Sequence, residues 1–163
     1  MTITGHANII KYCNRPFLHV EEMDNQLLEN INCQVKENDR LFHLGDFARG
    51  NVEFYKKQIK CKNVFLIRGN HDKMKSWEED LFSGVADLNT VKVNIEGEEK
   101  SIVLCHYAMR VWNKSHHGVC HAWGHSHSTL PDDPNSMSMD VGVDNIAKIF
   151  SPDGINRLVK DYR

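Results

Sequence analysis

The chain has 163 residues, of which 40% are apolar and 26% are charged, a composition typical of a globular protein with one domain. Twenty basic and 22 acidic residues leave a formal net charge of -2, so no overall positive field favours bulk binding of nucleic acid or of an anionic membrane surface. The sequence has no apolar run of roughly 20 residues and no signal-peptide pattern at its start, which predicts a cytoplasmic protein.

The first half of the chain alternates between predicted helices and strands. From the periodicity of the apolar residues and the positions of the turn residues, helices are expected at residues 7–13, 20–35 and 51–59, and strands at 39–44 and 64–67. A further helix is expected at residues 73–81, with Asp72 as its N-cap. Strands that alternate with helices favour a largely parallel α/β sheet.

The second half has a different pattern. Residues 90–96 alternate between apolar and polar side chains, Gly97 supplies a turn, and residues 100–105 return, so a β-hairpin is expected here. Further strands are expected at 119–123 and 138–144, followed by a short C-terminal segment at 155–159.

The stretch from Val64 to Asp72 has the pattern of an active-site loop. A buried strand runs into Gly69, which allows a sharp turn, and then into three polar side chains at the carboxyl end of that strand. For Asp72 a capping role is favoured over chemistry, whereas Asn70 and His71 are better explained by a binding or catalytic role.

Ligand-type side chains follow four separate predicted strands. They are Asp46, Asn70 with His71, His106, and His125 with His127. A single histidine at a strand end is more often a structural residue, but four such coincidences favour a shared site. Mixed oxygen and imidazole ligands suit divalent ions such as Mn²⁺, Fe²⁺, Ni²⁺ or Zn²⁺. Two such ions with an activated water between them are the apparatus of phosphoryl displacement.

The order of these motifs resembles a known family. Gly45-Asp46, Gly69-Asn70-His71-Asp72, His106 and Gly124-His125-Ser126-His127 are similar to four of the five motifs of the calcineurin-like metallophosphoesterase superfamily, in particular to its small bacterial and phage members. The resemblance covers nearly the whole chain. It implies one α/β domain over residues 1–163, an αββα sandwich of two mixed β-sheets flanked by helices, with a truncated opening strand.

The resemblance also implies roles for individual residues. It implies two divalent metal ions, with Mn²⁺ as the first expectation and Fe²⁺, Ni²⁺ or Zn²⁺ as alternatives. Asp46 would bridge the two ions and His71 would be the catalytic residue that serves the leaving group or the developing phosphoryl charge. The remaining metal ligands would be Asn70, His106 and His125 at one ion and His127 at the other.

The start of the chain departs from the family pattern. The first motif of the family is Asp-x-His, and here Met1 and Ile3 occupy its positions, although neither side chain can ligate a hard divalent ion. Three explanations stay open: a shortened version of an active enzyme, a variant that rebuilds the site with His6, water or another subunit, or a remnant with one metal or none. We expect residues 2–5 or a second copy of the chain to fill the place of the missing strand.

Arg110 and His117 are the candidate substrate contacts, because an arginine fork and an imidazole can hold phosphate oxygens; ordinary surface roles are equally compatible with the sequence. The predicted function is metal-dependent hydrolysis of a phosphate ester by a phosphatase or phosphodiesterase, with a metal-activated water at a binuclear centre. The small chain favours a small substrate such as a nucleotide or a cyclic phosphodiester. The alternative is a truncated or degenerate protein of the same fold that binds one metal or a phosphate-bearing partner without catalysis.

Overall fold

A computed structural model describes residues 4–131 and 133–145 of the chain. It divides into two compact units, an N-terminal unit of residues 1–86 and a C-terminal unit of residues 87–163, and each is described by itself. Among the described helices, none has the length and apolar content needed to cross a membrane. The single-domain prediction for residues 1–163 stays a prediction.

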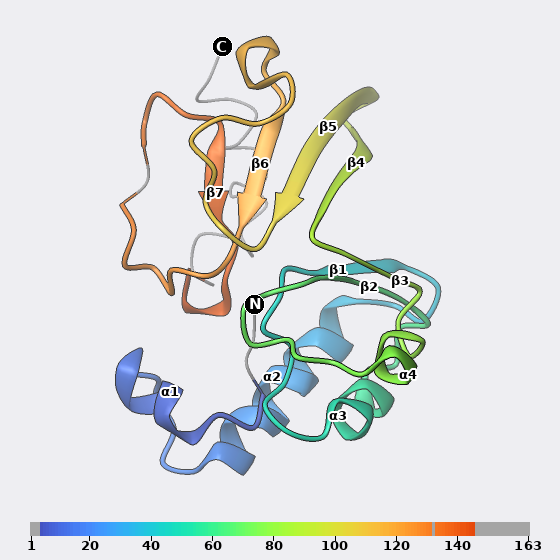
Figure 1. Ribbon diagram of the computed structural model, residues 1–163, viewed down its shortest axis with the longest axis vertical. Coiled ribbons are helices and arrows are strands. Elements are labelled where there is room, and N and C mark those ends of the chain that lie inside the picture. Colours follow the sequence, from blue (N-terminus) through green and yellow to red (C-terminus); the bar gives the residue numbers. More distant parts are fainter. Residues whose placement is uncertain (1–3, 132, 146–163) are drawn as a thin grey trace. The chain divides into compact units, whose positions relative to one another are not determined.

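The N-terminal unit alternates between helices and parallel strands, as the sequence predicts (Figure 1). Its elements in chain order are α1 (Ala7–Tyr12), α2 (Val20–Gln34), β1 (Arg40–His43), α3 (Val52–Gln58), β2 (Asn63–Ile67), α4 (Ser76–Glu79) and β3 (Gly84–Ala86). The sheet order is β1-β2-β3, and both pairings are parallel, with Leu41 opposite Val64 and Leu66 opposite Val85. Strand β3 was not predicted, because three residues are too short to show a period.

A hydrophobic core joins this sheet to α2 and α3, which lie on the same side of it in Figure 1. Val64 and Leu66 of β2 are fully buried and pack with Leu28 of α2 and Val52 of α3. The amide side chain of Asn51 caps α3 by accepting a hydrogen bond from the backbone N–H of Phe54. The core therefore holds β1 and β2 rigidly, and their carboxyl ends carry the predicted metal-binding loops.

The helix predicted at residues 73–81 is shorter than expected. Helix α4 spans only Ser76–Glu79, and its N-cap position is Lys75, so the prediction that Asp72 caps this helix is wrong. The reason is tertiary: the Asp72 carboxylate accepts hydrogen bonds from backbone N–H groups of the loops that follow β1 and β2, as described below.

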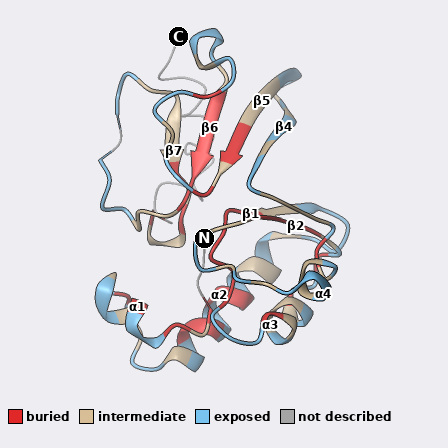
Figure 2. Cartoon of the chain, in the orientation of Figure 1, coloured by how far each residue is buried: buried red, intermediate tan, exposed pale blue. Residues whose placement is uncertain are grey.

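The C-terminal unit is built on a four-stranded sheet of order β4-β5-β6-β7. Its elements are β4 (Leu88–Ile95), β5 (Glu98–Cys105), a 3₁₀ turn η1 (Ser115–His117), β6 (Cys120–Trp123), β7 (Ser138–Asp140) and a second 3₁₀ turn η2 (Val143–Asn145). The predicted hairpin is confirmed, with β4 and β5 antiparallel, whereas β5, β6 and β7 run parallel to one another. Figure 2 shows that β6 is buried, which suits a central strand.

The predicted α/β fold with two sheets and flanking helices is confirmed. The described strands of the first sheet are all parallel and only the second sheet is mixed, in contrast to the two mixed sheets that we expected. The last predicted strand is also shorter, since β7 ends at Asp140. The segment expected at 155–159 lies outside the described residues.

Candidate functional site

Asp46 lies on a sharply turned loop directly after β1. Gly45 and Asp46 have consecutive positive φ angles of 82° and 52°, and the Asp46 side chain is almost completely buried. A non-glycine residue in the left-handed region costs free energy, and such residues cluster at functional sites. The carboxylate Oδ1 of Asp46 accepts a hydrogen bond of 2.9 Å from the backbone N–H of His71. The structure thus brings together two residues that the sequence predicts in one site.

Asp72 ties the loop after β1 to the loop after β2. Its carboxylate accepts hydrogen bonds from the backbone N–H groups of Asp46, Phe47 and Gly69, at 2.7, 2.7 and 2.8 Å. Burial raises the pKa of Asp72 above its usual range, an effect that these three donors oppose. Asp72 is therefore a structural residue that positions Asp46, and no ligand role is needed to explain it.

Asn70 and His71 occupy the exposed tip of the loop after β2. Asp46 accepts a hydrogen bond from the backbone N–H of His71 and not from its side chain. The backbone of His71 is therefore fixed, and its imidazole projects from this position. An exposed imidazole on a fixed loop can exchange a proton with a substrate, which suits the predicted catalytic role of His71.

The segment at the start of the described chain lies beside the Asp46 loop. Thr4 forms an isolated parallel bridge with Ala48, and its hydroxyl donates to the carbonyl of Phe47 at 3.0 Å. The backbone N–H of Gly5 donates to the buried carboxylate of Asp24 in α2, at 2.9 Å to Oδ2. Residues 1–3 lie outside the described residues, so the expectation that residues 2–5 fill the place of the missing strand stays a prediction.

Both ring nitrogens of His6 lie against nitrogen atoms of the protein, and the neutral ring can accept a hydrogen bond at only one of them. Nδ1 lies 3.2 Å from the backbone nitrogen of Ile9 in α1, and Nε2 lies 2.8 Å from a guanidinium nitrogen of Arg49. Burial, and then the charge of Arg49, lower the pKa of His6, so its imidazole is neutral at pH 7. In this arrangement neither nitrogen of His6 is available as a replacement metal ligand.

In the C-terminal unit, His106 and His125 face each other. His106 follows the last residue of β5, His125 lies two residues beyond β6, and Nε2 of His106 is 3.1 Å from Nδ1 of His125. Two nitrogens that each lie about 2.1 Å from one metal ion are about 3.0–3.4 Å apart for angles of roughly 90–110°. This pair of histidines therefore fits a single divalent ion, as two of its ligands.

His127 is oriented by a carboxylate. Its Nδ1 lies 2.7 Å from Oδ2 of Asp144 in η2, and neither side chain is more than 18% exposed. An Nδ1–H that donates to a carboxylate leaves Nε2 as the ligand atom, which is the usual arrangement of a metal-binding histidine. The residues of this pair thus fit the predicted ligand role of His127.

A second buried aspartate holds the His127 loop. Asp140 ends β7, is 1% exposed, and accepts backbone hydrogen bonds from Ser128 at 3.1 Å and Gly142 at 2.8 Å. Burial raises the pKa of Asp140. The loop needs this support because His127 and Ser128 both have positive φ angles, 47° and 64°.

His121, which the sequence analysis did not single out, organises the loop after His106. It is fully buried in β6, its Nδ1 lies 3.0 Å from the carbonyl of Val103, and its Nε2 accepts from the backbone N–H of Met109 at 3.2 Å. Burial lowers the pKa of His121, and the neutral form with the proton on Nδ1 satisfies these two contacts; Nε2 also lies 3.2 Å from the carbonyl oxygen of Tyr107. The periodicity places His121 inside a strand, but nothing in the sequence reveals its partners.

The two predicted substrate contacts lie in different places on the C-terminal unit. Arg110 is exposed and lines a pocket together with Met109 and Trp123. His117 is exposed on η1, where its ring lies against that of His116 with 4.1 Å between centroids, and it does not line this pocket.

Comparison with known proteins adds a family match. A family profile described as "Calcineurin-like phosphoesterase superfamily domain" matches residues 18–140. An uncharacterized protein of Methanocaldococcus jannaschii is 44% identical over 73 residues, a stretch that covers 42% of this chain and 42% of that relative. A crystal structure of a protein of unknown function from Aquifex aeolicus superposes with a TM-score of 0.66 at 23% identity, over 88% of this chain and 87% of the other. That structural likeness shows the fold.

Proposed function

Because the chain belongs to the calcineurin-like phosphoesterase superfamily, we propose that it is a metal-dependent hydrolase of a small phosphate ester. The observation that carries this proposal is the pair of facing nitrogens of His106 and His125, whose 3.1 Å separation suits one divalent ion. A second observation in the same unit supports it, namely the orientation of His127 by Asp144.

The proposed ligand set is taken from the family motifs. Following the family motifs, Asp46 and Asn70 join His106 and His125 at one ion, and His127 serves a second ion, with Mn²⁺ as the first choice and Fe²⁺, Ni²⁺ or Zn²⁺ as alternatives. When bound, divalent ions polarise a phosphoryl oxygen and lower the pKa of water.

The chain's own residues hold and orient the reacting groups. Asp72 and Asp140 fix the loops of Asp46 and His127 through backbone hydrogen bonds. His71 donates a proton to the leaving-group oxygen from its exposed imidazole, while Arg110 and His117 are proposed to contact the substrate phosphate.

A second candidate function has its own observation. The positions of the first family motif hold Met1 and Ile3, and His6 has both ring nitrogens engaged by the protein. A protein that binds one ion, or a phosphate-bearing partner, without turnover would follow from the loss of these ligands.

The proposal is tested by metal content and turnover on the same sample. The full chain is loaded with Mn²⁺, passed over gel filtration, analysed for metal, and assayed with a chromogenic phosphodiester. Two ions per chain with turnover support the proposed hydrolase. One ion without turnover supports the second candidate.

Three variants assign the roles. Asn70→Ala and His125→Ala are expected to lose most of the bound metal, whereas His71→Ala keeps the metal and loses turnover. Glu99→Gln, at an exposed position of the hairpin, is the matched control. Metal content that is unchanged in both Asn70→Ala and His125→Ala would contradict the proposed ligand set.

A further inference from the structure

An exposed arginine of the N-terminal unit lies on the same loop as Asp46. Arg49 follows Asp46 by three residues, and its side chain is exposed, whereas Asp46 is 2% exposed. Three residues of chain span at most about 11 Å between Cα atoms, so the two residues share one short loop. The loop after β1 therefore carries a permanent positive charge beside the carboxylate that the family motifs predict as a metal ligand.

The backbone of Arg49 is fixed by the start of the described chain. Its N–H donates to the carbonyl oxygen of Thr4 at 2.7 Å, and Thr4 forms a parallel bridge with Ala48. The carbonyl oxygen of Arg49 lies so close to Gly5 that a Cβ on Gly5 would be 2.4 Å from it. The guanidinium of Arg49 thus projects from a backbone that is packed on one side.

His6 orients this guanidinium. Its Nε2 lies 2.8 Å from Nη1 of Arg49. A guanidinium is always charged and only donates hydrogen bonds, so this contact selects the neutral tautomer of His6 that accepts at Nε2. The backbone N–H of Ile9 then has the carbonyl oxygen of His6, at 3.1 Å, as its acceptor. Because His6 is only 9% exposed, its ring sets the direction in which the guanidinium points.

The positive charge of Arg49 is not balanced by a neighbouring carboxylate. Within residues 4–131 and 133–145, Arg49 forms no ion pair, and the carboxylates of Asp24 and Asp72 accept backbone N–H groups instead. Burial lowers the pKa of His6, and the positive charges of Arg49 and of a protonated His71 lower it further. Arg49 and His71 are therefore both close enough to His6 to act on its charge.

A phosphate group is the anion that suits these side chains. A guanidinium has five N–H donors in one plane, so Arg49 can bind two phosphate oxygens while Nη1 stays on His6. The net charge of -2 gives the chain no general attraction for anions, so an anion bound here is bound by local groups.

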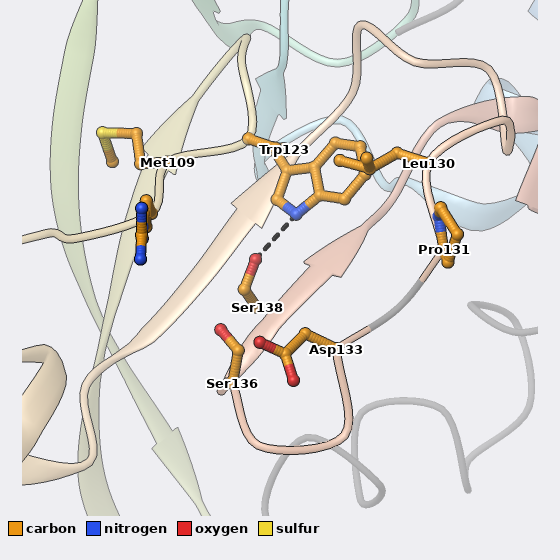
Figure 3. A pocket seen from close by; sticks show the side chains of 9 residues that line it. Met109, Trp123, Leu130, Pro131, Asp133, Ser136 and Ser138 are labelled. Atoms are coloured by element: carbon orange, nitrogen blue, oxygen red, sulfur yellow. Dashed lines mark hydrogen bonds between the residues drawn. The ribbon is translucent and has the colours of Figure 1, made fainter.

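The other arginine proposed to contact the substrate is less well ordered for this task. Arg110 lines the pocket of the C-terminal unit shown in Figure 3, and it makes no hydrogen bond or ion pair with the part of the chain that the structure describes. A long side chain loses conformational entropy when a ligand immobilises it. Arg49 loses less, because His6 already orients its guanidinium.

We propose that Arg49 binds the phosphate group of the substrate on the loop that carries Asp46. Only the word substrate rests on the proposed function, because binding of phosphate by Arg49 needs neither metal nor turnover.

The test titrates inorganic phosphate into the full chain at pH 7 in the presence of a chelator, and follows the Nε–H signal of Arg49 by nitrogen-15 NMR. The signal is assigned with an Arg49→Lys variant. Phosphate is expected to shift it at a concentration at least about tenfold lower than chloride or acetate at equal ionic strength. A shift that is the same for all three anions, or no shift, would overturn the proposal.

Substitutions of Arg49 sharpen the test, with phosphate affinity measured by calorimetry. Arg49→Gln should bind phosphate at least about tenfold more weakly, and Arg49→Lys, which keeps the charge but loses the planar fork, about threefold more weakly. Arg40→Gln removes an exposed arginine at the other end of β1 and is the matched control. Circular dichroism reports that each variant is folded. Equal phosphate affinities of Arg49→Gln and Arg40→Gln would show that Arg49 is not the binding residue.

The same variants separate this inference from the proposed function. In the chain loaded with Mn²⁺, Arg49→Gln is expected to keep its metal content and to raise the KM for the chromogenic phosphodiester about tenfold. Phosphate binding that depends on Arg49, in a chain that turns over no phosphate ester, supports the phosphate site and contradicts the hydrolase. Turnover with a KM that Arg49→Gln leaves unchanged supports the hydrolase and contradicts the role of Arg49.

Discussion

The Asp72 carboxylate accepts a hydrogen bond of 2.7 Å from the backbone N–H of Asp46, 26 residues earlier in the chain. Asp46 has a left-handed backbone, a conformation that the chain does not adopt without external support. This contact, with those to Phe47 and Gly69, makes Asp72 the residue that fixes one loop against the other.

Replacing Asp72 by asparagine is expected to cost about 2–4 kcal/mol of unfolding free energy, because an amide N–H₂ then faces a backbone donor in place of an acceptor. Urea unfolding followed by circular dichroism measures this change in the free energy of unfolding. Asp80→Asn, at the exposed C-cap of α4, is the matched control and should change stability by less than about 0.5 kcal/mol. Equal effects of the two substitutions would contradict the structural role of Asp72.

Asp144→Asn should change which ring nitrogen of His127 carries the proton. The carboxylate of Asp144 accepts from Nδ1 of His127, and an asparagine can place either an acceptor or a donor there, so the Nε2–H tautomer of His127 becomes populated. Nitrogen-15 NMR of the imidazole in the metal-free protein detects this tautomer directly, and Mn²⁺ affinity should fall about 10- to 100-fold. Glu99→Gln is the control. A His127 spectrum that does not respond to Asp144→Asn would show that Asp144 does not set the tautomer.

His121 makes stability depend on pH in a defined direction. Its pKa is lowered in the folded chain, so the unfolded chain takes up a proton first as the pH falls below about 6.5, and the free energy of unfolding decreases. His121→Phe should be destabilised by about 2–3 kcal/mol at pH 7.5, because it leaves the Val103 carbonyl and the Met109 N–H without their partner. The difference in the free energy of unfolding between His121→Phe and the unmodified chain should become smaller towards pH 5.

Urea unfolding at several pH values between 5 and 7.5 checks this expectation for His121. His19→Phe replaces an exposed histidine that makes no side-chain hydrogen bond at the start of α2, and it should leave the pH dependence unchanged. A constant difference between His121→Phe and the unmodified chain over this range would contradict the lowered pKa.

Gly5 and Gly97 form a matched pair for testing the start of the chain. Both have positive φ, 73° and 88°, so alanine at either position costs about 1 kcal/mol of backbone strain. A Cβ at Gly5 would also lie 2.4 Å from the carbonyl oxygen of Arg49, whereas a Cβ at Gly97 meets nothing within 4 Å. Gly5→Ala should therefore be about 2–3 kcal/mol more destabilising than Gly97→Ala in thermal unfolding. Similar losses of stability in Gly5→Ala and Gly97→Ala would mean that the Thr4–Gly5 segment does not lie against the Asp46 loop.

The sequence by itself determined most of the order of elements and the family to which the chain belongs. The alternation of apolar and polar residues predicted the β4–β5 hairpin, and the helical period predicted α2 to within one residue. The family match covers residues 18–140, and the family could be predicted from the sequence because local patterns of strand, glycine and polar residue are visible in a linear chain.

Only the tertiary structure decided which side chains support those motifs. Asp72 was expected to cap a helix, yet it accepts N–H groups from residues 46 and 47, and Asp140 was expected only to continue a strand, yet it holds the loop of His127. A buried carboxylate satisfies whichever backbone donors the fold brings to it, and those donors are far away in sequence. Hydrogen-bond partners of this kind depend on the packing of whole elements, whereas periodicity depends only on near neighbours along the chain.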